Sequence, residues 1–360
     1  MINVTKTDLP PLEDYIRYLK QIWSNRWVTN DGELLKLLEK RLMDHLNVKN
    51  LLIVSNGTSA LQIALKSFKI TGEVITTPFT FAATTNAILW ENLTPVFADI
   101  DPETYNIDPR DVERKITNKS SAIIAVHVYG NPCYVDELQE IAENNGLILI
   151  YDAAHAFGVK YNNESILNFG DVSTLSFHAT KIFNTAEGGA IVVKDEELFE
   201  KIRLMRNHGI KSEEKVVLPG INAKMTEFQA ALGLCNLKYI KEKRKQRKNL
   251  YEYYKKNLRS SNGISFQEIS ASTYNYSYMP VCFQNIETRD LVYSELIEND
   301  INPRKYFFPL TSNFDYFAKN GDLGLKTSFS VANRILCLPL YPDLNKDVVK
   351  IISDIILSKV

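Results

Sequence analysis

The chain has 360 residues, 45% of them hydrophobic and 24% charged, and its 42 Lys and Arg nearly balance its 43 Asp and Glu, giving a net charge of -1. This balance argues against nucleic acid as the main partner, because phosphate backbones are bound by a surplus of basic residues. The N-terminus lacks a signal-peptide core and no apolar run approaches the roughly 18 residues of a membrane span, so we expect a cytoplasmic protein with no membrane partner.

The first elements are two amphipathic helices, predicted at 12–24 and 34–46 from apolar residues that recur at helical spacing. A short apolar strand at 51–54 then runs into the polar turn Ser-Asn-Gly-Thr-Ser at 55–59, which opens another helix. Such a turn presents backbone N–H groups and hydroxyls at the positive end of a helix, which suits a phosphate. Because Ser and Gly also serve there simply as caps, the turn alone leaves both interpretations open.

A regular alternation of strands and helices follows. It predicts strands at 74–77, 95–99, 122–128 and 147–151, and helices at 83–90, 109–115 and 135–145. This order is typical of a mostly parallel sheet covered by helices on both faces. Ligands of such sheets gather beyond the carboxyl ends of the strands, where Asp152 closes an apolar strand. A buried carboxylate there needs a cation or hydrogen-bond donors, although an ordinary turn aspartate is an equal alternative.

Lys181 lies in a polar segment between two predicted strands, 172–177 and 190–193. A lysine in this position is either a solvated loop charge or an amine nucleophile held beside a carbonyl cofactor. The segment by itself does not decide between the two.

The second half contains predicted helices at 195–207, 226–258, 289–299 and 348–357, and an aromatic-rich strand at 276–283. The long helix carries a basic run at 238–256, whose helical spacing predicts a solvated face. We expect a large domain of residues 1–235 and a smaller C-terminal α/β domain of residues 236–360. Four cysteines lie far apart in apolar contexts, which predicts buried residues of a reducing compartment: Cys133, Cys235, Cys282 and Cys337.

Four features of the chain together match the needs of pyridoxal phosphate. The 55–59 turn offers an anion cradle, and Phe81 offers an aromatic face. Asp152 offers a carboxylate that holds the ring nitrogen protonated, and Lys181 offers an amine for the aldehyde. The combination favours a cofactor site over the separate structural explanation of each residue. No metal is expected.

Five motifs of the chain resemble those of a known family. S-F-H-A-T-K-x-F-N-T-x-E-G-G, D-A-A-H-A-F-G, P-F-T-F-A-A-T, S-N-G-T-S-A-L and G-I-N-A-K-M-T-E-F-Q-A-A-L-G are similar to the motif set of the DegT/StrS-type sugar aminotransferases. These are fold-type I enzymes that use pyridoxal 5'-phosphate to aminate nucleotide-linked keto-sugars. The resemblance therefore implies a mostly parallel central sheet with flanking helices and a smaller C-terminal domain.

The resemblance also implies roles for individual residues. Lys181 becomes the Schiff-base lysine, Asp152 the partner of the ring nitrogen, and Phe81 the stacking ring. His155 stands where many relatives have a glutamine that contacts the phenolic oxygen of the cofactor. The cofactor phosphate is assigned to Thr58, Ser59 and Ser176 of one subunit and to Asn222 of its neighbour, which implies a homodimer with shared active sites.

The resemblance places two further residues on the substrate side of the site. His178 and Tyr306 match positions near the sugar, while a structural role for His178 is an equal alternative. Lys224 replaces an arginine common in relatives, and Thr311 replaces a histidine. These departures weaken any transfer of detailed sugar specificity.

The resemblance predicts a ping-pong reaction in which L-glutamate is the amino donor, 2-oxoglutarate is released, and a keto-sugar is the acceptor. Relatives that aminate carbon 3 commonly carry S-F-Y-P-x-K-N-L-G-A-L-G-D-G-G, whereas this chain looks more like the carbon-4 group. We therefore expect dTDP-4-keto-6-deoxy-D-glucose to become dTDP-4-amino-4,6-dideoxy-D-glucose, for a surface polysaccharide such as lipopolysaccharide O-antigen. The alternatives are carbon-3 amination, sugar dehydration, in which the lysine is typically a histidine, and a cofactor-binding regulator without turnover.

Overall fold

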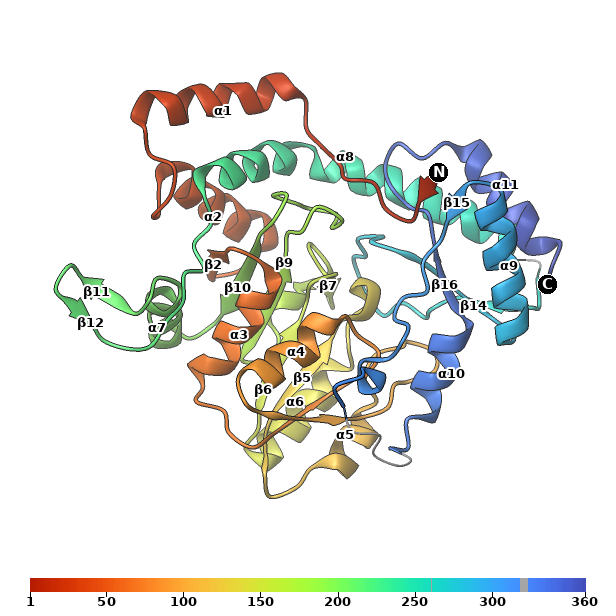
Figure 1. The fold of residues 1–360 in the computed structure, drawn as a ribbon, viewed down its shortest axis with the longest axis horizontal. Helices are drawn as coiled ribbons and strands as arrows, with labels where there is room; N and C mark the ends of the chain where they lie inside the picture. The colour runs from red at the N-terminus through yellow and green to blue at the C-terminus, as the bar shows by residue number, and fades with distance from the viewer. Residues whose placement is uncertain (260, 318–322) are drawn as a thin grey trace.

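The computed structural model describes residues 1–259, 261–317 and 323–360, and its centre is a seven-stranded sheet (Figure 1). The strand order is β2-β10-β9-β6-β5-β3-β4, and all strands run parallel except β10, which is antiparallel to both of its neighbours. The strands are β2 (Asn50–Val54), β3 (Glu73–Thr76), β4 (Thr94–Phe97), β5 (Ser120–Val126), β6 (Ile148–Asp152), β9 (Val172–Ser176) and β10 (Gly189–Val193). The predicted mostly parallel sheet is confirmed.

Helices cover both faces of this sheet, as the alternating side chains of β6 show. Leu149 and Tyr151 belong to one core cluster, while Ile150 between them belongs to another. The first cluster includes residues of α2 (Glu33–Leu46), α5 (Pro109–Lys115) and α6 (Val135–Asn145); the second includes residues of α3 (Gly57–Ser67), α4 (Ala82–Trp90) and α7 (Glu196–Arg206). Burial on both faces explains why the strands read as apolar runs rather than as an alternation.

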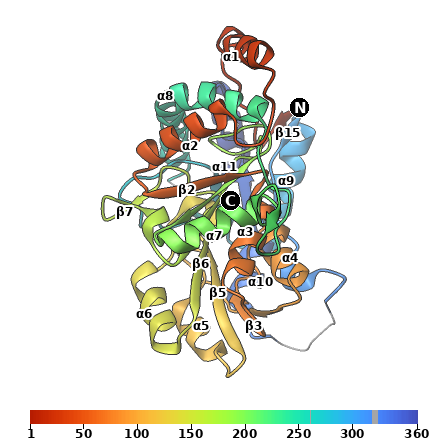
Figure 2. The ribbon, with the colours of Figure 1, turned by 90° about the vertical axis from the view of Figure 1, so that its left-hand side faces the viewer.

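The long helix α8 (Glu227–Leu258) joins the two parts of the chain. A capping box between Thr226 and Gln229 fixes its start. It contacts α1 (Leu12–Asn25) and α2, and it also contacts α11 (Lys346–Leu357). In both views α1, α2 and α8 lie at one end of the molecule and α5 and α6 at the other (Figures 1 and 2). The predicted domain boundary after residue 235 falls inside α8 and stays a prediction.

The C-terminal part is built on the antiparallel sheet β13-β14-β16, with strands β13 (Ile264–Ser265), β14 (Met279–Phe283) and β16 (Ile335–Leu338). Helices α9 (Ile286–Glu298) and α10 (Lys326–Arg334) contact this sheet, and α11 contacts α9. The start of the chain returns to this part, because β1 (Ile2–Asn3) pairs in parallel with β15 (Ile301–Asn302). Two small hairpins complete the described strands: β7 (Lys160–Tyr161) with β8 (Glu164–Ser165), and β11 (Ile210–Ser212) with β12 (Lys215–Val216).

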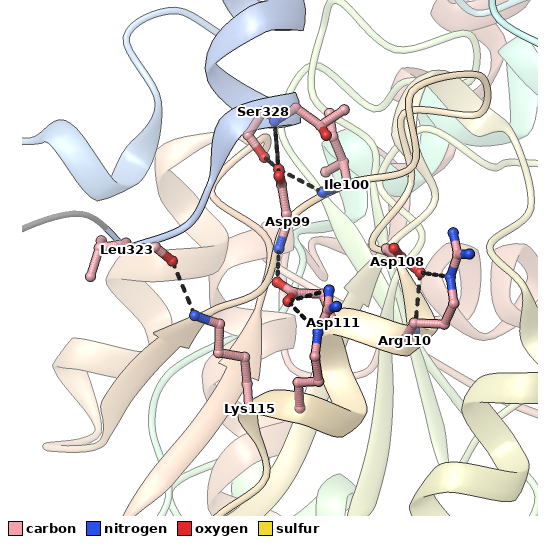
Figure 3. Close-up of polar contacts among 10 residues, drawn as sticks. Asp99, Ile100, Asp108, Arg110, Asp111, Lys115, Leu323 and Ser328 are labelled. Carbon is pink, nitrogen blue, oxygen red and sulfur yellow. Dashed lines mark hydrogen bonds and ion pairs between the residues drawn. The ribbon is translucent and has the colours of Figure 1, made fainter.

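A carboxylate from the large sheet caps a helix of the C-terminal part (Figure 3). Asp99 follows β4, and its Oδ2 accepts from the backbone N–H of Thr327 at 2.8 Å, while its Oδ1 accepts from that of Ser328 at 2.7 Å. These are N–H groups in the first turn of α10, which lack acceptors within the helix. Leu325, at the N-cap position, supplies no side-chain cap. A residue more than 200 positions earlier therefore performs the capping.

The predicted helices and strands named above are all present, with ends that shift by a few residues. The sequence did not predict α10, β16 or the strands of two or three residues. All four cysteines are buried and free, as expected. Among the described residues, no helix combines the length and apolar character that crossing a membrane requires.

Candidate active site

A cavity of about 560 Å³ lies where several strands of the large sheet end. Asp152 is the last residue of β6, Val126 the last of β5 and Ser176 the last of β9, and all three line it. The turn after β2 and the segment after β3 supply further lining residues. The cavity thus lies at the carboxyl edge of the sheet, where the parallel topology predicts a ligand.

The first turn of α3 forms one wall. The Oδ1 of Asn56 caps this helix by accepting from the backbone N–H of Ser59 at 2.8 Å. The preceding N–H groups, of Gly57 and Thr58, have no acceptor within the helix. Together with the hydroxyls of Thr58 and Ser59, they form a set of donors at a positive helix end, which suits an anion.

Two glycines allow this turn to approach the sheet. A Cβ added at Gly57 would lie 3.0 Å from the Cβ of Ser176, and one added at Gly189 would lie 2.7 Å from the backbone carbon of Asn56. Any side chain at Gly189 would collide with the turn itself. The close approach brings the hydroxyl of Ser176 beside the first turn of α3, so the predicted phosphate residues Thr58, Ser59 and Ser176 come together.

Asp152 is a buried carboxylate, with 6% of its surface exposed. Its Oδ2 accepts from the hydroxyl of Thr84 at 2.8 Å, and its Oδ1 accepts from the backbone N–H of Ala154 at 3.1 Å. Burial raises the pKa of Asp152, against the opposing effects of these two donors and of Lys181. No ion pair joins this carboxylate to a cation among the described residues, so it is suited to a positively charged ligand.

Lys181 lies between β9 and β10, partly buried, and its backbone N–H donates to the carbonyl of His178 at 2.9 Å. Burial lowers the pKa of Lys181 to about 8; the carboxylate of Asp152 opposes this shift and the guanidinium of Arg304 adds to it. A lowered pKa leaves a larger share of the amine neutral at physiological pH. A neutral amine is the form that attacks a carbonyl carbon.

His155 is 6% exposed and is held in one orientation. Its Nδ1 accepts from the backbone N–H of Tyr129 at 3.2 Å, and its ring stacks on Phe307 at 5.9 Å between centroids. Burial, aided by Lys181, lowers the pKa of His155 well below its ordinary value. Because Nδ1 is an acceptor, the neutral ring carries its hydrogen on Nε2, which makes His155 a donor toward an oxygen in the cavity.

The remaining predicted residues differ in how they meet the cavity. Phe81, the N-cap residue of α4, lines it with 53% of its surface exposed, which leaves an aromatic face free for a ligand. His178 lines it from an exposed position, and Tyr306 lines it while 7% exposed. His178 Nδ1 lies 2.9 Å from the hydroxyl of Thr180.

Asn222 does not line this cavity. It is exposed, and its backbone pairs with that of Asn207. Lys224 donates to the Oδ1 of Asn207 at 2.7 Å. Thr311 is buried and accepts from the hydroxyl of Thr85 at 2.9 Å. Within one chain, therefore, every predicted site residue except Asn222 meets in the same cavity.

Sequence reasoning missed several residues of the site, of which Thr84 and Arg304 are chemically the most important. Thr84 is three positions beyond Phe81 on α4, and this helical spacing was the available signal. Arg304 is two positions before Tyr306, inside the same R-K-Y-F-F-P-L-T motif. Thr84 does not line the cavity but holds Asp152, whereas Arg304 lines it together with Gln62, Thr180, Glu187, Tyr278 and Phe307.

The residues of the cavity fit pyridoxal phosphate, the cofactor expected from the sequence. Helix α3 offers donors for a phosphate. The buried carboxylate of Asp152 forms no ion pair within the described residues, and a pyridinium can provide the cation. Lys181 offers an amine whose pKa is lowered to about 8. The set thus contains an anion cradle, a carboxylate and an amine around one cavity.

Comparison with known proteins supports this interpretation. The model of the DegT/DnrJ/EryC1/StrS aminotransferase family matches residues 12–357. The chain is 43% identical to a dTDP-4-amino-4,6-dideoxy-D-glucose transaminase of Escherichia coli, over 99% of this chain and 98% of that protein. It is 41% identical to a Shigella dysenteriae protein of the same name, over 98% and 97%.

Solved structures of aminotransferases have the same fold as this chain. DesI, crystallised in the presence of its TDP-sugar product, is similar with a TM-score of 0.93 and 32% identity, over 98% of this chain and 91% of that one. PseC of Helicobacter pylori, an aminotransferase of pseudoaminic acid biosynthesis, has a TM-score of 0.91 and 27% identity, over 99% and 98%. The expected fold-type I architecture is confirmed.

Proposed function

The chain belongs to the DegT/DnrJ/EryC1/StrS aminotransferase family, and on this premise we propose that it transfers the amino group of L-glutamate to dTDP-4-keto-6-deoxy-D-glucose. The products are 2-oxoglutarate and dTDP-4-amino-4,6-dideoxy-D-glucose. The proposal depends above all on the 43% identity to the Escherichia coli transaminase of that product, which extends over nearly the whole of both chains. The cavity, which brings together every predicted site residue except Asn222, supports it.

The cofactor is pyridoxal 5'-phosphate. When bound, it supplies an aldehyde for amine exchange and a ring that takes up the electron pair released by proton removal. In our proposal Asp152 holds the ring nitrogen protonated, and the amine of Lys181 moves the proton at the α-carbon of the donor and at the acceptor carbon. The pKa of Lys181, lowered to about 8, suits an amine that must both take up and release a proton near neutral pH.

We assign the other predicted residues to binding. Thr58, Ser59 and Ser176 donate to the phosphate together with the free backbone N–H groups of α3. The exposed ring of Phe81 stacks on the cofactor. His155 donates from Nε2 to the phenolic oxygen, because its Nδ1 is already an acceptor.

His178 and Tyr306 are assigned to the sugar substrate. Both line the cavity, and Tyr306 is held by the guanidinium of Arg304 at 2.9 Å from its hydroxyl. His178 is exposed and keeps its Nε2 3.7 Å from the Oε1 of Glu187. A polar pair at the cavity suits the hydroxyl groups of a sugar.

Asn222 is assigned to the active site of a second copy, so the working unit is a homodimer. The supporting observation is that Asn222 is exposed and outside the cavity of its own chain. Four buried cysteines without disulfides are consistent with a reducing compartment, and we place the reaction in the cytoplasm. The amino sugar is then a precursor of a surface polysaccharide such as O-antigen.

The test is to incubate the holoenzyme with L-glutamate and either dTDP-4-keto-6-deoxy-D-glucose or a dTDP-3-keto-6-deoxyhexose, and to locate the new C–N bond by NMR. We expect a nitrogen at carbon 4. Lys181→Ala is the control, and it should form no product. Amination at carbon 3 would overturn the proposed regiochemistry, while a wild-type protein that binds the cofactor but converts neither sugar would favour a binding protein.

A further inference from the structure

Arg304 brings a positive charge to the cavity that the proposed reaction has not yet used. It lines the cavity from an exposed position and, with Lys181, is one of the two Lys or Arg side chains among the described lining residues. No ion pair joins it to an acid in the described part of the chain. An exposed guanidinium without a carboxylate partner is free to bind an anionic ligand.

The guanidinium is held in place rather than loose. Its Nη1 donates to the hydroxyl of Tyr306 at 2.9 Å, and its central carbon lies 4.1 Å from the centroid of the same ring. The backbone of Arg304 exchanges two hydrogen bonds with Cys337, at 3.0 and 2.8 Å. Tyr306 is itself fixed, because its carbonyl accepts from the hydroxyl of Tyr129 at 2.5 Å. Such support reduces the entropy lost when a ligand binds.

Most of the N–H groups of Arg304 are left for a ligand. A guanidinium has five N–H donors in a planar fork, and the hydroxyl of Tyr306 takes one of them. A fork of this kind matches the two oxygens of a carboxylate. Arg304 also lies close enough to Lys181 to lower the pKa of that amine by repulsion. Arg304 and Lys181 line the same cavity, so a ligand that reaches the amine also enters the cavity of the guanidinium.

The cofactor phosphate already has a set of donors without Arg304. Its proposed cradle is the first turn of α3, where Asn56 is the cap, whereas Arg304 comes from the segment after β15 in the C-terminal part. The amino donor of the proposed function, in contrast, is a dicarboxylate. Both of its carboxylates lose solvent when it enters the cavity, and each then needs donors or a cation.

We propose that Arg304 binds a carboxylate of the amino donor, and so determines that a dicarboxylic amino acid fills this role. The inference rests on the proposed function, since it names the residue that selects the donor of that reaction. Arg304 keeps its contact with Tyr306, which lines the same cavity, in both halves of the reaction.

The decisive measurement is the affinity of the holoenzyme for glutarate, a dicarboxylate without an amino group, by isothermal titration calorimetry. Arg304→Gln should weaken glutarate binding by about 10- to 100-fold, the range expected for hydrogen bonds to a charged group. Arg304→Lys keeps the positive charge but loses the planar fork of donors, so its affinity for glutarate should lie between those of the wild type and Arg304→Gln. The matched control is Lys305→Gln, because Lys305 is the next residue but pairs with Asp290 at 2.6 Å and does not line the cavity.

Two results would overturn the inference. One is an unchanged glutarate affinity in Arg304→Gln or, if that variant does not fold, in Arg304→Lys. The other is a loss of affinity for dTDP with glutarate binding unchanged, which would assign Arg304 to the diphosphate of the sugar substrate. Lys305→Gln should bind glutarate as tightly as the wild type does, which would show that the loss in Arg304→Gln is specific to that residue.

Failure of the inference and failure of the proposed function give different results. If wild-type holoenzyme changes its visible absorbance with L-glutamate and Arg304→Gln responds at the same concentration, only the inference fails. If glutarate binding depends on Arg304 but the wild type transfers no nitrogen to the 4-keto sugar, the assigned acceptor fails and the dicarboxylate site stands.

Discussion

Replacing Thr84 by Val should destabilise the apoprotein in a way that depends on pH. The substitution removes the hydroxyl that donates to the Oδ2 of Asp152 at 2.8 Å and leaves a buried carboxylate with the Ala154 N–H as its remaining donor. A hydrogen bond to a charged group is worth about 1.5–3 kcal/mol, whereas one between neutral groups is worth about 0.5–1.5 kcal/mol. At neutral pH the free energy of unfolding should therefore fall by about 1.5–3 kcal/mol.

The sign of the pH dependence follows from the pKa of Asp152. Burial already raises it above its ordinary value of 3.8, and loss of the Thr84 donor raises it further. A carboxyl group whose pKa is raised on folding weakens the folded state as pH increases, because the folded protein holds the proton more tightly than the unfolded chain. The deficit of the variant should thus be small near pH 4 and grow as pH increases toward neutrality.

The assay is urea denaturation of the apoprotein between pH 4 and 8, with Thr85→Val as the matched control. Thr85 is the next residue of α4, is equally buried, and donates to the neutral hydroxyl of Thr311 at 2.9 Å. Its substitution should cost a nearly constant amount across this range. Bound pyridoxal phosphate should reduce the loss of stability in Thr84→Val, because a pyridinium gives the buried carboxylate of Asp152 a positively charged partner. If the loss of unfolding free energy in Thr84→Val is as independent of pH as the loss in Thr85→Val, then Thr84 does not stabilise the charged form of Asp152.

Three other predictions concern the cofactor. The rate at which Lys181 captures pyridoxal phosphate covalently, followed by visible absorbance, should increase with pH and level off above about 8, where the amine is mostly neutral. In Arg304→Gln the midpoint of this increase should move to higher pH, because the positive charge that lowers the pKa of Lys181 is lost. Mixing Asn222→Ala subunits with Lys181→Ala subunits should restore activity to about a quarter of the wild-type value. About half of the dimers are then mixed, and each mixed dimer holds one intact site of its two. If no activity returns, the site is not shared between subunits. Phe81→Ala should weaken cofactor binding by about tenfold, as measured by equilibrium titration, because an exposed stacking face is lost; an unchanged affinity would show that Phe81 does not stack.

The sequence predicted the parts of this fold that depend on local patterns. Apolar strands alternating with helices led to the parallel sheet, and a carboxylate at a strand end led to Asp152 at its edge. The reversed direction of β10 was not predictable in this way, because a strand buried on both faces has the same apolar composition whichever way it runs.

The missed site residues were missed for a related reason. Thr84 has no distinguishing motif, and its role depends on a hydrogen bond to a residue 68 positions away. Arg304 is placed by a backbone bridge to Cys337, a long-range contact that no local periodicity encodes. Asn222, in contrast, was suggested by the family resemblance alone, and its proposed role requires a second chain.

The capping of α10 by Asp99 has a consequence for attempts to divide this protein. If the chain were cut within α8 and the C-terminal piece produced alone, the first turn of α10 would lose the carboxylate that accepts from Thr327 and Ser328. Loss of an N-cap of this kind costs about 0.5–2 kcal/mol. The N-terminal piece would in turn expose the carboxylate of Asp99 without these partners. The start of α10 should therefore be less stable in the isolated C-terminal piece than in the whole chain, and adding the N-terminal piece should restore the lost stability.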